Sequence, residues 1–318
     1  MNAKRSLIGA SAALLAGIGV AGSWAQAPDP AIPPPLIAQD AAVKVSDHVY
    51  VILDEDRGFV PNIGIVVGDR ATLVIDTGLG LPNGEIVFGE AQKLSASDEF
   101  YVVSTHYHSE HDLGAGAFPD SATMIRSRDQ QRDLDEFRLS HAERFSQMSP
   151  TMAELLRGAD FRPADVHFDD EYTLDLGGVS VRMYAVGPAH TLGDTAVFVE
   201  EDGVLFAGDV AMRRYPRFAS PSSGIGVWLE ALAALARLDV DVLVPSHGPL
   251  GDAGTIEANV EYFTALRSRA RALKAAGRSE DEVAEMLTDE LAPRFSDWAS
   301  EGIERIGPGA RLAFREAP

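Results

Sequence analysis

Three histidines and a glutamate fall within six consecutive positions, and this cluster constrains the chain more than any other feature of its sequence. The segment Thr-His-Tyr-His-Ser-Glu-His-Asp follows an apolar run that is typical of a buried β-strand. His106 and His108 are two positions apart, so an extended segment points both imidazoles to the same side. Glu110 and His111 come next, where Ser109 is expected to cap a helix. This composition predicts a metal site.

The lack of cysteine narrows the chemistry of that site. The chain has 318 residues and no Cys, which excludes disulfides, thiolate metal ligands and a cysteine nucleophile. Any metal must therefore be held by His and carboxylate side chains. The hydrophobic fraction of 46% is ordinary for a globular protein. The net charge of -21 repels other polyanions, so no nucleic-acid partner and no binding to anionic lipid are expected.

The N-terminus has the pattern of a secretory signal peptide. Lys4 and Arg5 precede an apolar run over residues 7–21, and Ser-Trp-Ala follows as a small-x-small cleavage pattern. We therefore expect a signal peptide over residues 1–25 and export, with the periplasm as the compartment. The apolar run is short for a membrane span, so no stable span is expected after cleavage. Five prolines then predict an extended, stiff tether over residues 26–42.

The remaining chain alternates groups of short β runs with helical segments. Strands are expected at 49–53, 63–67, 72–75, 99–104, 172–174, 179–184, 195–199, 204–206 and 242–244. Helices are expected at 86–94, 127–156, 227–238, 256–276 and 280–291, with a capping box formed by Ser279 and Glu282. The pattern predicts an α/β (α+β) fold, with a catalytic domain over 43–254 and a C-terminal helical extension over 255–318.

Three further potential ligands follow or lie between predicted strands. His190 stands in a loop between two strands, Asp209 follows a glycine at the end of another, and His247 follows a third apolar strand. If these strands are neighbours, all the candidate ligands converge on one edge of the fold.

These motifs, in this order, resemble the metallo-β-lactamase superfamily of zinc hydrolases. The resemblance runs from about residue 43 to about residue 249 and includes Asp76-Thr-Gly after a strand, the His-x-His-x-acid-His motif, the Gly-Asp209 strand end and the final His247-Gly. It implies an αββα sandwich, in which two mixed β-sheets pack together with helices on the outer faces. The metal site would lie at one edge of that sandwich.

The resemblance also implies two Zn²⁺ ions per chain. It assigns three ligands to the first ion: His106, His108 and His190. It assigns three to the second, Glu110, His111 and His247, with Asp209 bridging both ions. Asp76 would hydrogen-bond a ligand histidine and fix its tautomer. Asp194 would hold its own loop.

One position departs from the family pattern. The family usually has Asp where this chain has Glu110. The additional methylene displaces the carboxylate by about an ångström or more, against a bond-length tolerance of about 0.2 Å. We therefore expect a weakened second zinc site. The neighbouring Asp112 is interpreted as an acid in the first turn of a helix.

The resemblance implies hydrolysis of a small-molecule substrate. A metal-bound hydroxide would open an activated acyl bond, in a β-lactam, a lactone or a related ester, with Glu110 and Asp209 as catalytic groups. Four residues are candidate substrate contacts: Phe59, Tyr107, Arg213 and Arg214. His48, His141 and His167 match no motif position and are interpreted as structural or surface residues. The oligomeric state stays open.

Three alternatives remain at this point. A thioesterase of the glyoxalase II type retains Asp209, but its substrates are mainly cytoplasmic. A mononuclear iron sulfur dioxygenase is compatible with a second site that Glu110 impairs. A non-catalytic metal-binding accessory protein of a periplasmic pathway is the third alternative. Metal content separates these readings, since two zinc ions favour the hydrolase and one iron favours the dioxygenase.

Overall fold

The computed structural model describes residues 35–298 and 302–318. The expected signal peptide and most of the expected tether lie outside the described residues. Among the helices of the described part, none is both long enough and apolar enough to cross a membrane.

The first sheet contains seven strands in chain order: β1 (Ala42–Lys44), β2 (Val49–Ile52), β3 (Ile63–Val67), β4 (Thr72–Ile75), β5 (Phe100–Val103), β6 (Thr123–Ser127) and β7 (Val166–Phe168). β1 to β4 pair antiparallel, whereas β4 to β7 pair parallel. The sheet is therefore mixed, and its parallel half directs the carboxyl ends of β4, β5 and β6 to the same edge.

The second sheet contains five strands in the order β12-β11-β10-β9-β8. Their bounds are β8 (Glu171–Asp175), β9 (Ser180–Ala185), β10 (Thr195–Val199), β11 (Val204–Gly208) and β12 (Val242–Pro245). β8 to β11 pair antiparallel, and β11 pairs parallel with β12. The carboxyl ends of β11 and β12 are therefore neighbours, as the ligand pattern of the sequence requires.

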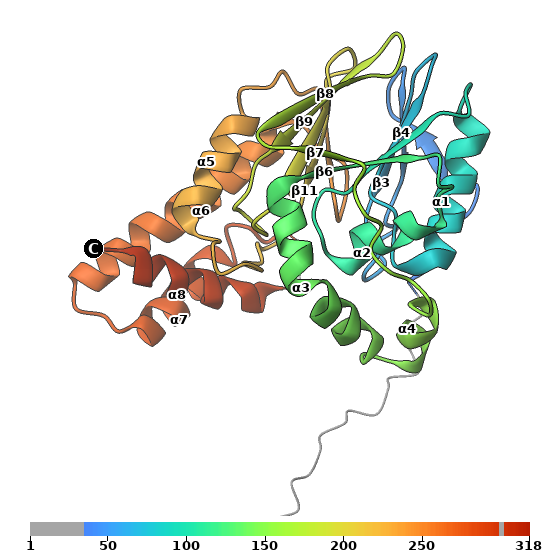
Figure 1. Cartoon of the computed structure of the whole chain (residues 1–318). Helices are drawn as coiled ribbons and strands as arrows, with labels where there is room; N and C mark the ends of the chain where they lie inside the picture. Colours follow the sequence, from blue (N-terminus) through green and yellow to red (C-terminus); the bar gives the residue numbers. More distant parts are fainter. Residues whose placement is uncertain (1–34, 299–301) are drawn as a thin grey trace, which may run out of the picture.

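Helices cover the outer faces of the two sheets, so the expected αββα sandwich is confirmed (Figure 1). α1 (Gly80–Leu94) lies against the first sheet, and α5 (Ile225–Leu235) with α6 (Ala253–Ala275) lies against the second. α7 (Glu280–Leu291) and α8 (Ile306–Glu316) continue the α6 side. α2 (Ser109–Asp112), α3 (Arg128–Ser146) and α4 (Pro150–Leu155) belong to the connections that follow β5 and β6.

Alternate residues of the central strands face opposite sides of each sheet, so each sheet packs on the other sheet with one face and on helices with the other. Leu73 and Ile75 of β4 face the apolar cluster between the sheets, and Val74 faces the cluster under α1. Val197 of β10 likewise faces the inner cluster, whereas Phe198 faces the cluster under α5 and α6. Strands buried on both faces read as continuous apolar runs, which is the pattern that the sequence shows at these positions.

The C-terminal helices belong to the same core as the sandwich. Phe263 of α6, Leu287 of α7 and Ala310 of α8 are buried in one cluster with Trp228 of α5. The capping box of Ser279 and Glu282 is confirmed at the start of α7. The division at residue 255 therefore does not separate two apolar cores.

The described end of the expected tether packs on α1. The side chain of Ile37 is buried in the cluster under α1, and its backbone N–H donates to Asn83 Oδ1 at 2.8 Å. Asn83 Nδ2 donates in turn to the carbonyl of Pro35. Residues 35–37 are thus attached to the domain.

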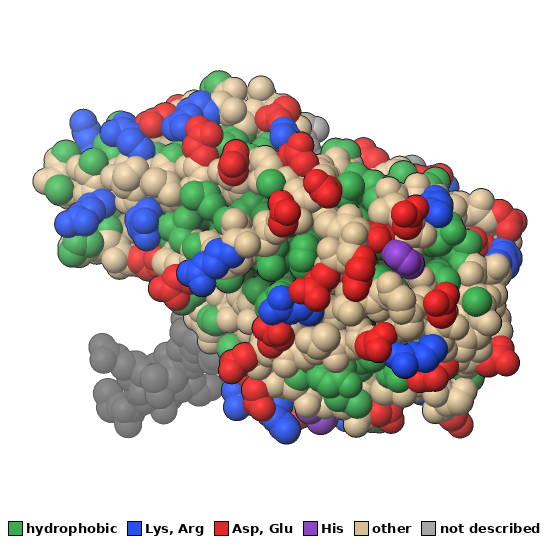
Figure 2. Space-filling model, turned by 90° about the horizontal axis from the view of Figure 1, so that it is seen from above, with side chains coloured by type: hydrophobic (Ala, Val, Ile, Leu, Met, Phe, Trp, Pro, Cys, Tyr) green, Lys and Arg blue, Asp and Glu red, His purple; other side chains and the backbone are tan. Residues whose placement is uncertain are grey.

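Acidic side chains spread across the face that Figure 2 shows, with separate basic side chains between them. This distribution matches the net charge of -21 of the whole chain.

Candidate metal centre

The candidate ligands come from segments that meet at one edge of the sandwich. β5 leads into His106 and His108, the loop between β9 and β10 carries His190, β11 leads into Asp209, and β12 leads into His247. Gly208, just before Asp209, has φ of 59°, a left-handed conformation that favours glycine. The sharp change of direction at the end of β11 therefore depends on a residue without a side chain.

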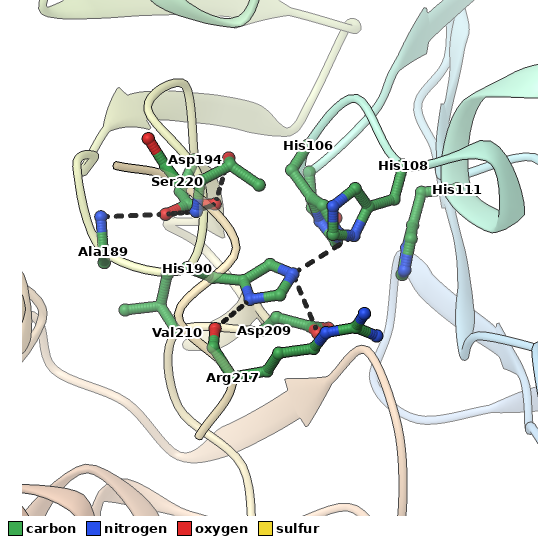
Figure 3. Close-up of polar contacts among 12 residues, drawn as sticks. His106, His108, His111, Ala189, His190, Asp194, Asp209, Val210, Arg217 and Ser220 are labelled. Carbon is green, nitrogen blue, oxygen red and sulfur yellow. Dashed lines mark hydrogen bonds and ion pairs between the residues drawn. The ribbon is translucent and has the colours of Figure 1, made fainter. Parts of the chain in front are cut away.

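Three imidazole nitrogens converge on one point (Figure 3). His106 Nε2 lies 3.0 Å from His108 Nδ1, and His190 Nε2 lies 3.2 Å from the same His108 atom. Tetrahedral Zn²⁺ with Zn–N bonds of about 2.0–2.1 Å would separate neighbouring nitrogens by about 3.3 Å. The set His106, His108 and His190 therefore fits a metal ion.

These three histidines are buried, each at most 5% exposed. Burial lowers the pKa of His106 and His108 well below the ordinary value. The Nδ1–H of His190 donates to the carbonyl of Arg217 at 2.6 Å, which leaves its Nε2 free as the ligand atom. An outer hydrogen bond of this kind fixes the tautomer before a metal arrives.

A second group of donors lies beside the first. Ligand atoms of His106, His111 and Asp209 lie within 4.8 Å of one another. His111 Nε2 and Asp209 Oδ1 are buried and have no hydrogen-bond partner among the described residues. His247 donates Nδ1–H to the carbonyl of Val60 at 3.1 Å, and its ring centroid is 5.4 Å from that of His111. Buried atoms without partners fit a second cation.

Asp209 is the carboxylate at the junction of the two groups. Its Oδ2 lies 3.4 Å from His190 Nε2. Burial alone would raise the pKa of Asp209, but the charges of the surrounding imidazoles lower it to about 2. The side chain is therefore ionised at neutral pH and ready to bind a cation.

Asp76 supports the site from outside. Its Oδ2 lies 2.9 Å from His111 Nδ1, and its Oδ1 accepts the backbone N–H of Thr105 at 2.7 Å. Asp76 thereby connects the ends of β4 and β5 to a ligand histidine. Burial lowers the pKa of His111, but the charge and hydrogen bond of Asp76 outweigh it and raise that pKa to about 9 in the metal-free chain.

We expect Asp76→Asn to weaken the metal at His111 by about 10- to 100-fold. The amide keeps the shape but loses the charge that orients the imidazole and strengthens its basicity. Zinc competition with a chromogenic chelator measures the affinity, with the exposed Asp98→Asn as the control. An affinity equal to that of the wild type would show that Asp76 does not tune the ligand.

Ser109 does not cap α2 with its side chain, contrary to the sequence prediction. The N-cap residue is His108, and no side-chain cap bond is present at this end. Ser109 Oγ instead lies 2.9 Å from His141 Nδ1, and its backbone N–H donates to the same nitrogen at 3.3 Å. The hydroxyl bonds a residue of α3 because α3 packs directly over α2.

α2 is fixed by a buried ion pair that the sequence prediction did not include. Arg126 Nη2 lies 2.7 Å from Asp112 Oδ2, and both side chains are fully buried. Asp112 therefore joins α2 to β6 and is more than an acid in a first helical turn. The segment just after α2 also lies close to the backbone of α1, since a Cβ on Gly84 of α1 would lie 2.0 Å from the Gly114 carbonyl oxygen.

Glu110 lies on α2 with its carboxylate buried. Its Oε2 has no hydrogen-bond partner among the described residues, and burial raises its pKa. One Glu110 oxygen lies within 4.8 Å of ligand nitrogens of His108 and of His141. The structure thus groups Glu110 with His108 and His141, whereas His111 and Asp209 belong to a different group with His106.

Asp194 holds the His190 loop. It accepts the backbone N–H groups of Thr191 and Ala189, and the Thr191 hydroxyl donates to it at 2.6 Å. These bonds close the turn that presents His190 (Figure 3).

The candidate substrate contacts lie in different environments. Tyr107 is buried against Phe137 and His141, and Phe59 packs edge-to-face on Phe145. Both arginines form ion pairs with acidic side chains of the chain. Arg213 pairs with Asp297 at 2.6 Å, and Arg214 pairs with Asp56 at 2.9 Å.

Arg217 is the arginine that reaches towards the metal ligands. Its side chain is exposed and extends beside Asp209 and His190 in Figure 3. No ion pair joins it to the described acidic residues. In the sequence it belongs to one basic cluster with Arg213 and Arg214, which we expected to hold a substrate carboxylate, and nothing in the sequence separates it from these two paired neighbours.

Comparison with known proteins places this site in a family. The model of the metallo-beta-lactamase superfamily matches residues 56–247. The atrochrysone carboxyl ACP thioesterase of Emericella nidulans is 23% identical over 205 residues, which cover 64% of this chain and 57% of that protein. The human acyl-coenzyme A thioesterase MBLAC2 is 24% identical over 221 residues, covering 64% of this chain and 79% of that protein. The alignment thus spans little more than half of the Emericella protein.

Solved structures share the fold. The sec-alkylsulfatase Pisa1 from Pseudomonas has a TM-score of 0.63 at 16% identity, covering 86% of this chain and 50% of that one. A metallo-beta-lactamase from Pontibacter korlensis has a TM-score of 0.55 at 19% identity, covering 70% and 98%. The extent of the family match, together with the His-rich site at the sandwich edge, leads to one conclusion. This chain belongs to the metallo-beta-lactamase superfamily.

Proposed function

We propose that this chain is a zinc-dependent hydrolase of activated acyl bonds and that thioesters are its favoured substrate class. The observation that carries the proposal is the convergence of the nitrogens of His106, His108 and His190 at separations of 3.0 and 3.2 Å. Imidazole nitrogens in this arrangement suit Zn²⁺.

The second donor group supports a second zinc ion. His111, His247 and Asp209 would hold it, and Asp209 borders both groups. Bound zinc polarises a carbonyl oxygen and lowers the pKa of bound water towards neutrality. Glu110 is grouped with His108 and His141, so three side chains would hold the second ion, one fewer than the resemblance assigns to it.

The side chains of this site have three roles: they would bind the metal, shield a ligand from water and attract the substrate. The three buried histidines would hold the first ion, and the ionised Asp209 carries the negative charge that would attract a cation to the junction. The buried Tyr107 ring packs against the His108 ring, with centroids 4.9 Å apart, and shields this side of His108 from water. The exposed Arg217 supplies a positive charge next to Asp209, where it attracts an anionic group on the substrate.

Relatives support the choice of thioesters. The Emericella protein acts on an acyl carrier protein thioester and the human protein on acyl-coenzyme A, according to their names. Zinc-assisted attack on a carbonyl suits thioesters, lactones and β-lactams alike because each reaction passes through a tetrahedral oxyanion. Geometry at the metals alone does not separate these substrates.

A substrate panel tests the proposal. The zinc-saturated protein is assayed with an acyl-coenzyme A, an aryl lactone and a chromogenic cephalosporin, each with and without chelator. We expect the acyl-coenzyme A to give the highest kcat/KM and chelation to remove the activity. Faster opening of the cephalosporin would make the chain a β-lactamase. No hydrolysis of any of the three by folded, zinc-loaded protein would overturn the proposal.

We also propose that the chain is exported. The basic residues Lys4 and Arg5, the apolar run and the small-x-small pattern support this. Expression of the full chain in a bacterium with a periplasm tests it, since mass spectrometry of the periplasmic fraction is expected to find an N-terminus near Gln26. Recovery of the intact chain in the cytoplasm alone would contradict export.

A further inference from the structure

We propose that His141 is a positioning residue of the metal centre. Its Nε2–H holds the Glu110 carboxylate next to His108, so that Glu110 supports the three-histidine site from outside. The inference rests on the metal binding of the proposed function, and it gives a role to a histidine that matches no motif of the sequence.

The first observation is the packing of the two rings. The His141 ring lies parallel to that of His108, at an interplanar angle of 6° and a centroid distance of 4.3 Å. Tyr107 and Phe145 confine the His141 ring at centroid distances of 5.4 and 5.0 Å. The α3 helix thus presses one imidazole flat against another that ligates the metal.

The second observation fixes the His141 tautomer. The backbone N–H of Ser109 can only donate, and it points at His141 Nδ1 at 3.3 Å. Nδ1 is therefore the acceptor, and the proton resides on Nε2. His108 has the complementary arrangement, since its Nδ1 faces His106 and His190 and its Nε2 carries the proton once metal binds.

The third observation is an unpartnered oxygen of the Glu110 carboxylate. Glu110 is 9% exposed, and its Oε2 has no hydrogen-bond partner among the described residues. One of its oxygens lies within 4.8 Å of a nitrogen of each ring. A buried carboxylate oxygen without a partner is costly, and an imidazole N–H that reaches it would relieve that cost.

A metal shared by His108 and His141 does not fit this geometry. Ring lone pairs lie in the ring planes, so those of two parallel rings run side by side. They do not converge on a point about 2.0–2.1 Å from both nitrogens. A carboxylate has two oxygens and can accept one hydrogen bond from each ring, which is why we assign Glu110 to this position.

The longer side chain of Glu110 fits the same account. Where the family usually has Asp, the additional methylene of Glu110 lets the carboxylate reach the His108 side of α2. His141 then supplies the partner that retains it there. The chain would bind its first metal tightly and its second metal with His111, Asp209 and His247 alone.

Measurement of zinc affinity tests the inference and does not depend on catalytic activity. Chelator-stripped full-length protein is titrated with Zn²⁺ against a chromogenic chelator, and Co²⁺ absorption reports the ligand field of the first site. We expect His141→Ala to weaken the tighter site by about 10- to 100-fold and to change the Co²⁺ spectrum. His141→Gln retains one donor and one acceptor and is expected to recover part of the affinity.

Two comparisons make the result specific. His167→Ala removes an exposed histidine of β7 and is expected to leave both sites unchanged. Glu110→Ala is expected to weaken the tighter site as His141→Ala does, and the double variant is expected to be no worse than either single variant. Thermal melting of each metal-free variant shows that the chain is folded.

Three outcomes separate the hypotheses. A wild-type chain that binds no metal would overturn the proposed function, and this inference with it. Wild-type binding with an unchanged tighter site in His141→Ala and in His141→Gln would overturn this inference alone. Loss of only the weaker ion in Glu110→Ala would also overturn it, because Glu110 would then be a ligand of the second metal.

Discussion

His108→Ala is expected to abolish hydrolysis and to remove the tighter metal ion. Two other ligand nitrogens lie at 3.0 and 3.2 Å from His108 Nδ1, so this residue is the common neighbour in the three-histidine group. Loss of an outer partner of a ligand costs about 10- to 100-fold in affinity or activity. Removal of the ligand itself is expected to cost more than that in kcat/KM.

Steady-state kinetics with an acyl-coenzyme A, together with the zinc content per chain, measures the effect. His167→Ala is the matched control, since it removes a histidine of the same size from an exposed position. Full turnover by His108→Ala with zinc still bound would refute the metal assignment.

Arg126→Met is expected to lower the free energy of unfolding by about 3–5 kcal/mol. The guanidinium and the Asp112 carboxylate are both fully buried and lie 2.7 Å apart. Methionine fills similar volume but leaves the Asp112 charge buried without its cation. Chemical denaturation of the metal-free protein measures the change.

A control and a double variant sharpen this prediction. Arg132→Met removes an exposed arginine that pairs with Asp129 three residues earlier, and it is expected to change stability by less than about 1 kcal/mol. Arg126→Met combined with Asp112→Leu removes both charges and is expected to recover most of the loss. Equal stability of Arg126→Met and the wild type would show that the pair is not what fixes α2.

The candidate ligands could be selected from the sequence because each stands at a recognisable chain position. His106 and His108 follow a strongly apolar strand with a spacing of two, and Asp209 and His247 follow apolar strands of their own. β11 and β12 pair in parallel, which brings the last two together at the predicted edge. Local pattern and sheet topology therefore agree on where these side chains lie, and their role as ligands stays a prediction.

Short strands and small helices were harder to predict. β1, β6 and β7 were absent from the predicted strands. Thr123–Ser127 contains a buried arginine, and β1 and β7 have only three residues each. α1 begins at Gly80, six residues before the predicted start, since its first five residues include two glycines and a proline. Tertiary contacts stabilise these segments more than their own composition does.

Contacts between distant segments explain the rest. His141 lies on a polar helix 33 residues after His108, and no spacing rule connects the two rings that stack in the fold. The partner of Asp112 was likewise invisible, since Arg126 looks like any surface arginine until β6 buries it. Side chains that act through packing leave little trace in a single sequence.

The dependence of hydrolysis on bound zinc tests the central claim most directly. Metal-free protein is titrated with Zn²⁺ while the hydrolysis rate of an acyl-coenzyme A and the number of ions per chain are measured on the same sample. We predict that activity is absent without metal and rises in proportion to the first ion bound. A metal-free chain that is fully active, or a folded chain that binds zinc and hydrolyses no activated acyl substrate, would contradict the account.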